Sequence, residues 1–276
     1  PLYPLVEAVT AALFSPDERT TCAPFIRDAL STKRFVIPVV IALFPQMVIA
    51  TWFYGLKVPV MLFIAYTIGA LVESIFAWSR GEHIHEGFLV TGMLLVMIFP
   101  ITTPLWVFVI ATVFGIVFGK EVFGGVGRNP VNPALTGRLF VFLSWPALVA
   151  PSAYPLPQFR LFEWFSSAPD ALTSATPLAL TKLGHVSLTE PMPQLLLQVK
   201  PGCIGEIFVP MPDLFTQWLS GGFLLGAFFM ATDPVTIPIT RIGKWAAGVL
   251  CGVLVVTLRR FTPLVEGVMF AIILMN

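Results

Sequence analysis

The feature that most constrains this chain is a series of apolar segments, each close to the length that crosses a lipid bilayer. They lie at about residues 35–54, 58–78, 87–101, 103–119, 133–150, 221–232, 244–258 and 264–275. A spanning helix needs about 20 mostly apolar residues, and inside lipid every backbone polar group has to be satisfied within the protein. We therefore predict an all-α integral membrane protein.

The composition supports this fold class and excludes some functions. Hydrophobic residues make up 57% of the chain and charged residues 11%, whereas a typical soluble domain has about 25% charged residues. The formal net charge of +1 offers no basic surface for nucleic acid, so no nucleic-acid partner is expected. The three cysteines, Cys22, Cys203 and Cys251, are too far apart in the sequence for the paired thiolates typical of zinc and iron–sulfur sites.

Two proline-containing interruptions divide the apolar segments at matching places. Residues 99–104 read Phe-Pro-Ile-Thr-Thr-Pro, and residues 232–238 read Thr-Asp-Pro-Val-Thr-Ile-Pro. A Gly-Phe-Leu triplet precedes each of them, at residues 87–89 and 222–224, at a similar distance. The last three segments thus resemble the third to fifth, as in membrane folds built from an inverted repeat with broken helices.

The second half of this repeat has no counterpart of the segments at 35–54 and 58–78. We therefore expect two five-helix halves, of which the second lacks its first two spans near residues 206–212. The expected organisation is an N-terminal cytoplasmic segment (1–34), a first membrane repeat with five spans (35–150), an extracytoplasmic loop (151–206) and a second membrane repeat with three spans (207–276).

Basic residues near the ends of the segments predict the orientation, because they are enriched on the cytoplasmic side. The residues on the side predicted to be cytoplasmic are Arg27, Lys33, Arg34, Arg80, Lys120, Arg128 and Arg138. The N-terminus is therefore expected in the cytoplasm, and five crossings place residues 151–206 outside. Arg259 and Arg260 fall on the outer side by this count and argue against it.

A hydroxyl-rich motif lies in the predicted outer loop. Residues 170–177 read Asp-Ala-Leu-Thr-Ser-Ala-Thr-Pro. Asp170, Thr173, Ser174 and Thr176 fit the pattern Asp-x-x-(Ser/Thr)-(Gly/Ser)-Ala-Thr that flavin transferases recognise. The alternative is a solvated turn rich in serine and threonine.

A second motif follows the fourth apolar segment, at residues 119–138. Its glycines permit positive φ and close approach of a ligand to the backbone. Asn129 and Asn132 each offer an amide donor and an acceptor, and such groups suit the edge of a planar heterocycle. The alternative is a cytoplasmic loop that leads into the next helix.

Together the motifs resemble a known family. They are Gly-Lys-Glu-Val-Phe-Gly-Gly-x-Gly-Arg-Asn-x-x-Asn-Pro-Ala-Leu at 119–135, Thr-Ser-Ala-Thr at 173–176 and Phe-Met-Ala-Thr-Asp-Pro-Val at 229–235. The chain resembles, almost end to end, the family of the B subunit of the sodium-translocating NADH:quinone oxidoreductase. It is similar, more distantly, to the D subunit of the Rnf ferredoxin:NAD oxidoreductase.

The resemblance implies roles for individual residues. Thr176 matches the threonine that is esterified to FMN, within a recognition motif for the flavin transferase formed by Asp170, Thr173 and Ser174. Asn129 and Asn132 match positions that hold a noncovalent riboflavin. Gly69 and Glu73 match a glycine and an acid near the proposed quinone pocket, and Asp233 and Glu206 match acids discussed for Na⁺ handling.

Two of these acids are also notable without the resemblance. Glu73 lies within an apolar segment, where an unpaired carboxylate is costly and is a functional candidate by default. Its alternative is a structural pairing with another helix. Asp233 lies at a helix interruption, where freed carbonyls and a carboxylate can bind a cation; its alternative is a cap for the following turn.

These observations predict a subunit of a redox-driven Na⁺ pump in the bacterial inner membrane. It would carry covalent FMN and riboflavin, and would pass electrons from NADH to ubiquinone or another quinone. Its expected partners are the other subunits, a flavin transferase, membrane lipid, quinone and Na⁺. Two alternatives remain open: the corresponding Rnf subunit, and a secondary transporter or channel without a redox cofactor, which the inverted repeat alone would favour.

Overall fold

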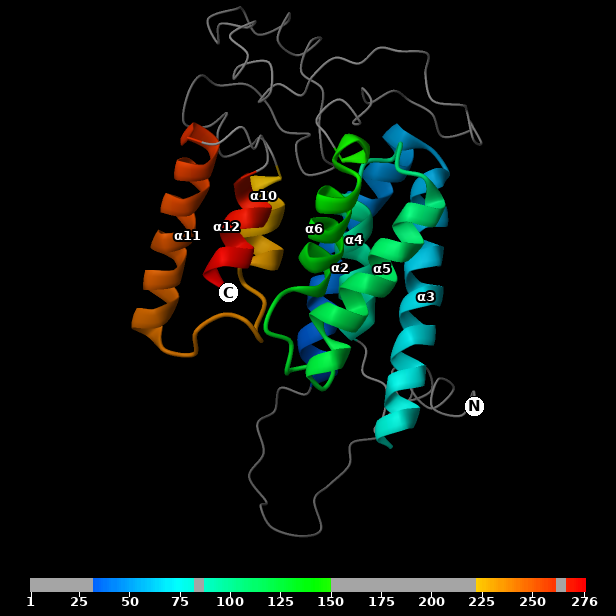
Figure 1. Ribbon diagram of the computed structural model, residues 1–276, viewed down its shortest axis with the longest axis horizontal. Helices are drawn as coiled ribbons and strands as arrows, with labels where there is room; N and C mark the ends of the chain where they lie inside the picture. Colours follow the sequence, from blue (N-terminus) through cyan, green and yellow to red (C-terminus); the bar gives the residue numbers. More distant parts are fainter. Residues whose placement is uncertain (1–31, 82–86, 150–221, 262–266) are drawn as a thin grey trace, which may run out of the picture.

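Every regular element in the described part of the chain is helical, which confirms the all-α prediction. The computed structural model describes residues 32–81, 87–149, 222–261 and 267–276 (Figure 1). The helices are α2 (Thr32–Tyr54), α3 (Lys57–Arg80), α4 (Gly87–Ile98), α5 (Leu105–Gly119), α6 (Pro133–Ser144), α10 (Phe223–Leu225), α11 (Arg241–Phe261) and α12 (Gly267–Met275). Short 3₁₀ turns η1 (Glu121–Phe123) and η2 (Pro146–Leu148) follow α5 and α6, and a π-helical turn, η5 (Gly226–Met230), follows α10.

Four of the described helical stretches are long and apolar enough to cross a membrane. They are Val36–Tyr54, Lys57–Arg80, Leu105–Phe123 and Arg241–Leu258. Helix α3 has 24 residues, which corresponds to about 36 Å at the rise of an α-helix and exceeds the roughly 30 Å of a hydrocarbon core. The apolar helices α4 and α6 are shorter, with 12 residues each.

Helices occupy the expected apolar segments, and four of the described ones are long enough to cross a membrane, but several of the predicted ends were wrong. Helix α6 ends at Ser144 and not at residue 150, because the residue before Pro146 is driven out of the α region. Helix α4 ends at Ile98, just before the Phe99-Pro100 step. The segment expected at 221–232 is a single α-helical turn that continues as the π-helical turn η5.

Helices α5 and α6 pack closely because glycines line their contact. A Cβ atom on Gly115 would lie 2.4 Å from the carbonyl oxygen of Pro133, and one on Gly137 would lie 2.5 Å from that of Ala111. Small residues are the usual means of close helix approach in membranes. On the same helix pair, the rings of Phe114 and Phe140 stack with centroids 4.1 Å apart.

The described helices of the two halves run in opposite directions. In Figure 1, α4 and α6 run upward and α5 downward, whereas α10 with η5 and α12 run downward and α11 upward. An inverted repeat requires such directions, although the repeat itself stays a prediction. The loop between α5 and α6 and the interruption between η5 and α11 consequently lie at the same, lower end.

Candidate functional site

The segment between α5 and α6 is a compact loop because three of its glycines adopt positive φ. These are Gly124, Gly125 and Gly127, with φ of 113°, 88° and 88°, values that side chains with a Cβ rarely tolerate. The turn brings the C-terminal end of α5 back toward α3. Lys120 and Glu121 lie where α5 ends and η1 begins, and both are buried.

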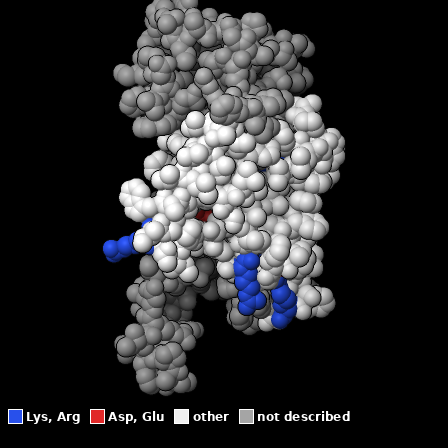
Figure 2. All heavy atoms as spheres, turned by 60° about the vertical axis from the view of Figure 1, so that its left-hand side comes forward, with Lys and Arg blue, Asp and Glu red and all other residues white. Residues whose placement is uncertain are grey.

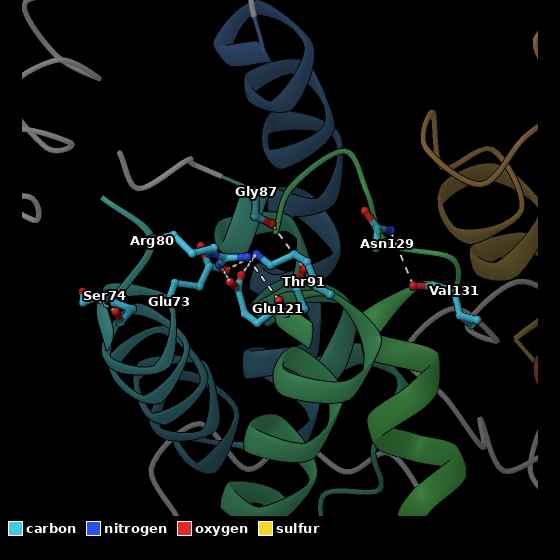
Figure 3. A network of polar contacts seen from close by, with 10 residues as sticks. Glu73, Ser74, Arg80, Gly87, Thr91, Glu121, Asn129 and Val131 are labelled. Atoms are coloured by element: carbon cyan, nitrogen blue, oxygen red, sulfur yellow. Dashed lines mark hydrogen bonds and ion pairs between the residues drawn. The ribbon is translucent and has the colours of Figure 1, made fainter. Parts of the chain in front are cut away.

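A network of four charged side chains connects this turn with α3 (Figure 3). The Lys120 ammonium donates a hydrogen bond to the Glu73 carboxylate, and it also lies 3.7 Å from Oε1 of Glu121. Arg80 forms an ion pair with Glu121 and donates from Nη1 to the Glu121 carbonyl oxygen at 3.1 Å. The two cations and two anions of this network balance in charge.

Glu73 therefore has the structural pairing that was the alternative to a free functional acid. Glu73 is 4% exposed and Lys120 is 3% exposed. Removal of one partner from such a buried pair leaves an uncompensated charge, which costs about 3–5 kcal/mol. Gly69 lies on the same face of α3, where a Cβ would meet Ile116 of α5 at 3.2 Å.

Asn132 forms a hydrogen bond between the two halves of the protein. It is the N-cap of α6, and its Oδ1 accepts a hydrogen bond from the Ala134 N–H at 3.0 Å, which satisfies a donor that the helix leaves free. Its Nδ2 donates to Oδ2 of Asp233, 101 residues further along the chain, at 3.3 Å.

Asp233 also has the local role that was weighed for it. Its Oδ1 accepts a hydrogen bond from the Val235 N–H at 3.2 Å and so caps the turn after η5. Burial raises the pKa of the Asp233 carboxyl above its ordinary value, while the hydrogen bonds from Val235 and Asn132 act in the opposite direction. Both carboxylate oxygens thus have donors from the protein.

These groups line a cavity of about 460 Å³ between the two halves. Its wall includes Asn129, Asn132 and Asp233, together with Gly127 and Lys120 of the segment between α5 and α6. Asn129 is buried, and its Nδ2 lies 3.5 Å from the Val131 carbonyl oxygen, at the limit of a hydrogen bond.

The remaining wall of the cavity is mostly apolar. Its members include Val36 and Val39 of α2, Val90 and Leu94 of α4, and Phe228 and Phe229 of η5. Ligand sites of about 300–1,000 Å³ typically combine such a wall with a few convergent polar groups. The volume, the apolar surfaces and the asparagine amides therefore fit a planar heterocycle with polar edges.

The structure brings together some of the expected site residues and separates others. The predicted riboflavin residues, Asn129 and Asn132, share the cavity with Asp233, which the resemblance had associated with Na⁺. Gly69 and Glu73 do not line this cavity; they lie on α3, where they face Ile116 and Lys120. Asp170, Thr173, Ser174, Thr176 and Glu206 lie outside the described residues.

Sequence reasoning missed the partners of Glu73. Lys120 and Glu121 belong to the motif at 119–138, for which the sequence indicated only a ligand site or a loop, and the helix that pairs with Glu73 was left open. The available signal was the Lys-Glu pair directly at the end of an apolar segment, where a charge has to find a partner or reach water.

The sequence is similar to known proteins along nearly its whole length. The sequence profile of the NQR2, RnfD, RnfE family matches residues 19–211 and 207–276. Similar proteins include the B subunit of the Na(+)-translocating NADH-quinone reductase of Haemophilus influenzae strain PittEE, which is 29% identical over 377 residues, with 100% of this chain and 89% of the relative covered. The same subunit of Klebsiella pneumoniae strain 342 is 30% identical over 379 residues, with 99% and 89% covered.

A relative from Chromohalobacter salexigens carries the same name and is 29% identical over 366 residues, with 99% of this chain and 86% of the relative covered. The family profile accounts for nearly the whole sequence, including the α5–α6 turn and the interruption at Asp233. The chain belongs to the NQR2, RnfD and RnfE family of membrane subunits.

Proposed function

We propose that this chain is the membrane subunit of a redox-driven Na⁺ pump that binds riboflavin between its two halves and carries FMN on Thr176. The observation that supports the riboflavin site is the cavity in which Asn129 and Asn132 converge. When bound, the flavins supply the electron-transfer chemistry between NADH and quinone. The protein's own task is to bind them, orient them and keep water away.

The residues of the cavity suit those tasks. Asn129 and Asn132 present amide groups to the edge of a ring, and Phe228, Phe229 and Val90 provide apolar surface for its faces. Asn132 is held by the start of α6 and by Asp233, so its amide has one orientation. A polar group fixed in this way binds a ligand without loss of side-chain entropy.

The covalent FMN and its maturation by a flavin transferase are proposed from the motif at Asp170, Thr173, Ser174 and Thr176. The test is ultraviolet illumination of this subunit on a denaturing gel. We expect a fluorescent band that is absent in Thr176→Val and present in the control Thr181→Val, which lies outside the motif. A dark wild-type band would contradict the proposal and favour a transporter without a redox cofactor.

Three further assignments complete the proposal. Gly69 and Glu73 contribute to a quinone site, and Asp233 and Glu206 to Na⁺ handling, by resemblance to the family. The location is a bacterial inner membrane with the N-terminus in the cytoplasm, in a complex with other subunits. Among the relatives, those quoted above are named for the NADH-quinone reductase, which favours NADH and quinone over the end partners of the Rnf complex.

The missing pair of spans also belongs to the proposal. The family profile matches in two stretches that meet at residues 207–211, which is where two spans of the second half are expected to be absent. The alignment with the Haemophilus protein is 377 positions long, 101 more than the 276 residues of this chain. Both facts support a segment in the relatives that has no counterpart here.

A further inference from the structure

The polar side chains of the cavity wall include amide groups that can donate hydrogen bonds and one carboxylate that can accept them. Of the two N–H bonds on Nδ2 of Asn132, the contact with Asp233 uses one, and Oδ1 is occupied by the Ala134 N–H. A carboxylate offers about four lone-pair positions, and the donors from Asn132 and Val235 account for two of those on Asp233. Asp233 therefore retains accepting capacity beside amide donors.

The two hydroxyl groups of the wall are weaker acceptors than the carboxylate, because a hydrogen bond to an ionised acceptor is stronger than one to a neutral oxygen. Thr91 donates to the carbonyl oxygen of Gly87 at 3.2 Å, and Thr232 donates to that of Phe228 at 2.5 Å. Both hydroxyl protons are thus used within their own helical turns. Among the described residues that line the cavity, Asp233 is the only carboxylate.

We propose that Asp233 determines the ligand specificity of this cavity by accepting a hydrogen bond from a ring N–H that stands between two carbonyl groups. The amides of Asn129 and Asn132 flank it as donors to those carbonyls. Such an imide edge is present on the isoalloxazine of riboflavin, so the inference rests on the proposed function and refines it.

The competing explanation is that Asp233 only caps its turn. That task needs one acceptor for the Val235 N–H, and an asparagine would perform it equally well. Asp233→Asn therefore separates the two explanations. It keeps an oxygen for Val235, but it replaces Oδ2 by an NH₂ group that faces the Asn132 amide and the ring N–H, where two donors meet without an acceptor between them.

The experiment uses the complete detergent-solubilised complex with isotopically labelled riboflavin. Unlabelled riboflavin and 3-methylriboflavin, which lacks the imide N–H, are compared as competitors. In the wild type we expect 3-methylriboflavin to compete about 10- to 100-fold more weakly, the value of a hydrogen bond to a charged group. In Asp233→Asn we expect weaker retention of riboflavin and no preference between the two compounds.

The control is Thr257→Val on α11, outside the cavity wall, whose hydroxyl is likewise bonded within its own helical turn, and it should keep the wild-type preference. Equal competition by both compounds in the wild type would overturn the inference. Normal retention of riboflavin by Asp233→Asn would also overturn it. A higher Na⁺ requirement for half-maximal turnover in that variant would then leave Asp233 with only the Na⁺ role given above. A wild-type complex without noncovalent flavin would refute the proposed function itself, and a variant that fails to assemble leaves the wild-type comparison to decide.

Discussion

At the scale of single residues, substitution of Lys120 should lower the stability of the protein strongly. Its ammonium compensates Glu73 and lies next to Glu121, and all three residues are buried. We expect Lys120→Met to destabilise the protein by about 3–5 kcal/mol, because two carboxylates then remain with one cation. Thermal unfolding of the purified complex measures this loss.

The neighbouring residues provide the controls for that change. Lys120→Met combined with Glu73→Gln restores the balance of charge and should recover much of the stability, since a neutral amide costs less to bury than a carboxylate. Lys244→Met removes an exposed lysine on α11 and should have little effect. A single Lys120 variant as stable as the Lys244 variant would show that the buried network contributes nothing.

At the scale of elements, the contact between α5 and α6 depends on the absence of side chains. Gly137→Ala would bring a Cβ to 2.5 Å from the carbonyl oxygen of Ala111, a backbone atom that cannot move alone. We expect the helices to separate and the unfolding free energy to fall by about 1–3 kcal/mol. Loss of riboflavin should accompany it, because α6 carries Asn132 at its N-terminus.

Gly248→Ala on α11 is the matched control for this prediction. A Cβ there would meet nothing within 4 Å, and alanine is a better helix former than glycine by up to about 1 kcal/mol. Its stability should be unchanged or slightly higher. Similar unfolding temperatures for both variants would mean that α5 and α6 have room to relax.

At the scale of the whole molecule, tryptophans mark two levels along the helices. Trp52 is in the last turn of α2 and Trp106 in the first turn of α5, two helix ends at the top of Figure 1. Trp78 is near the end of α3 and Trp245 near the start of α11, two helix ends toward the bottom. All four are exposed. Exposed tryptophans are typical of the two interfaces of a bilayer.

The charges distinguish these two levels. In Figure 2, the Lys and Arg side chains in view lie toward the lower end, and the flank above them is almost free of charge. Basic residues are enriched on the cytoplasmic side, so the lower end, with the α5–α6 turn and the cavity, is expected to face the cytoplasm. The segment 151–206 would then be extracytoplasmic.

Cysteine labelling tests this orientation. A variant that keeps only Cys203 should react with a membrane-impermeant maleimide in intact spheroplasts, because residue 203 belongs to the expected outer loop. A variant whose only cysteine is Thr240→Cys, in the exposed stretch before α11, should react only after the membrane is opened. The reverse pattern would invert the proposed topology and place the FMN motif in the cytoplasm.

The sequence alone was sufficient for the all-α membrane class, the existence of the apolar helices and the family. These properties depend on hydrophobicity and local motifs, which are read along the chain. The helix ends were predicted less accurately, since they depend on backbone geometry within a residue or two. Helix α6 ends before Pro146, and the stretch near 221–232 is partly π-helical.

Only the tertiary structure decided which distant groups meet. Glu73 lies 47 residues from Lys120, and Asn132 lies 101 residues from Asp233. Neither pairing follows from spacing, because each depends on how glycine-lined helices cross and on the turn that Gly124, Gly125 and Gly127 permit. The sequence determines the chemistry of each side chain. Its partner is determined by how the helices pack in three dimensions, which the sequence alone does not show.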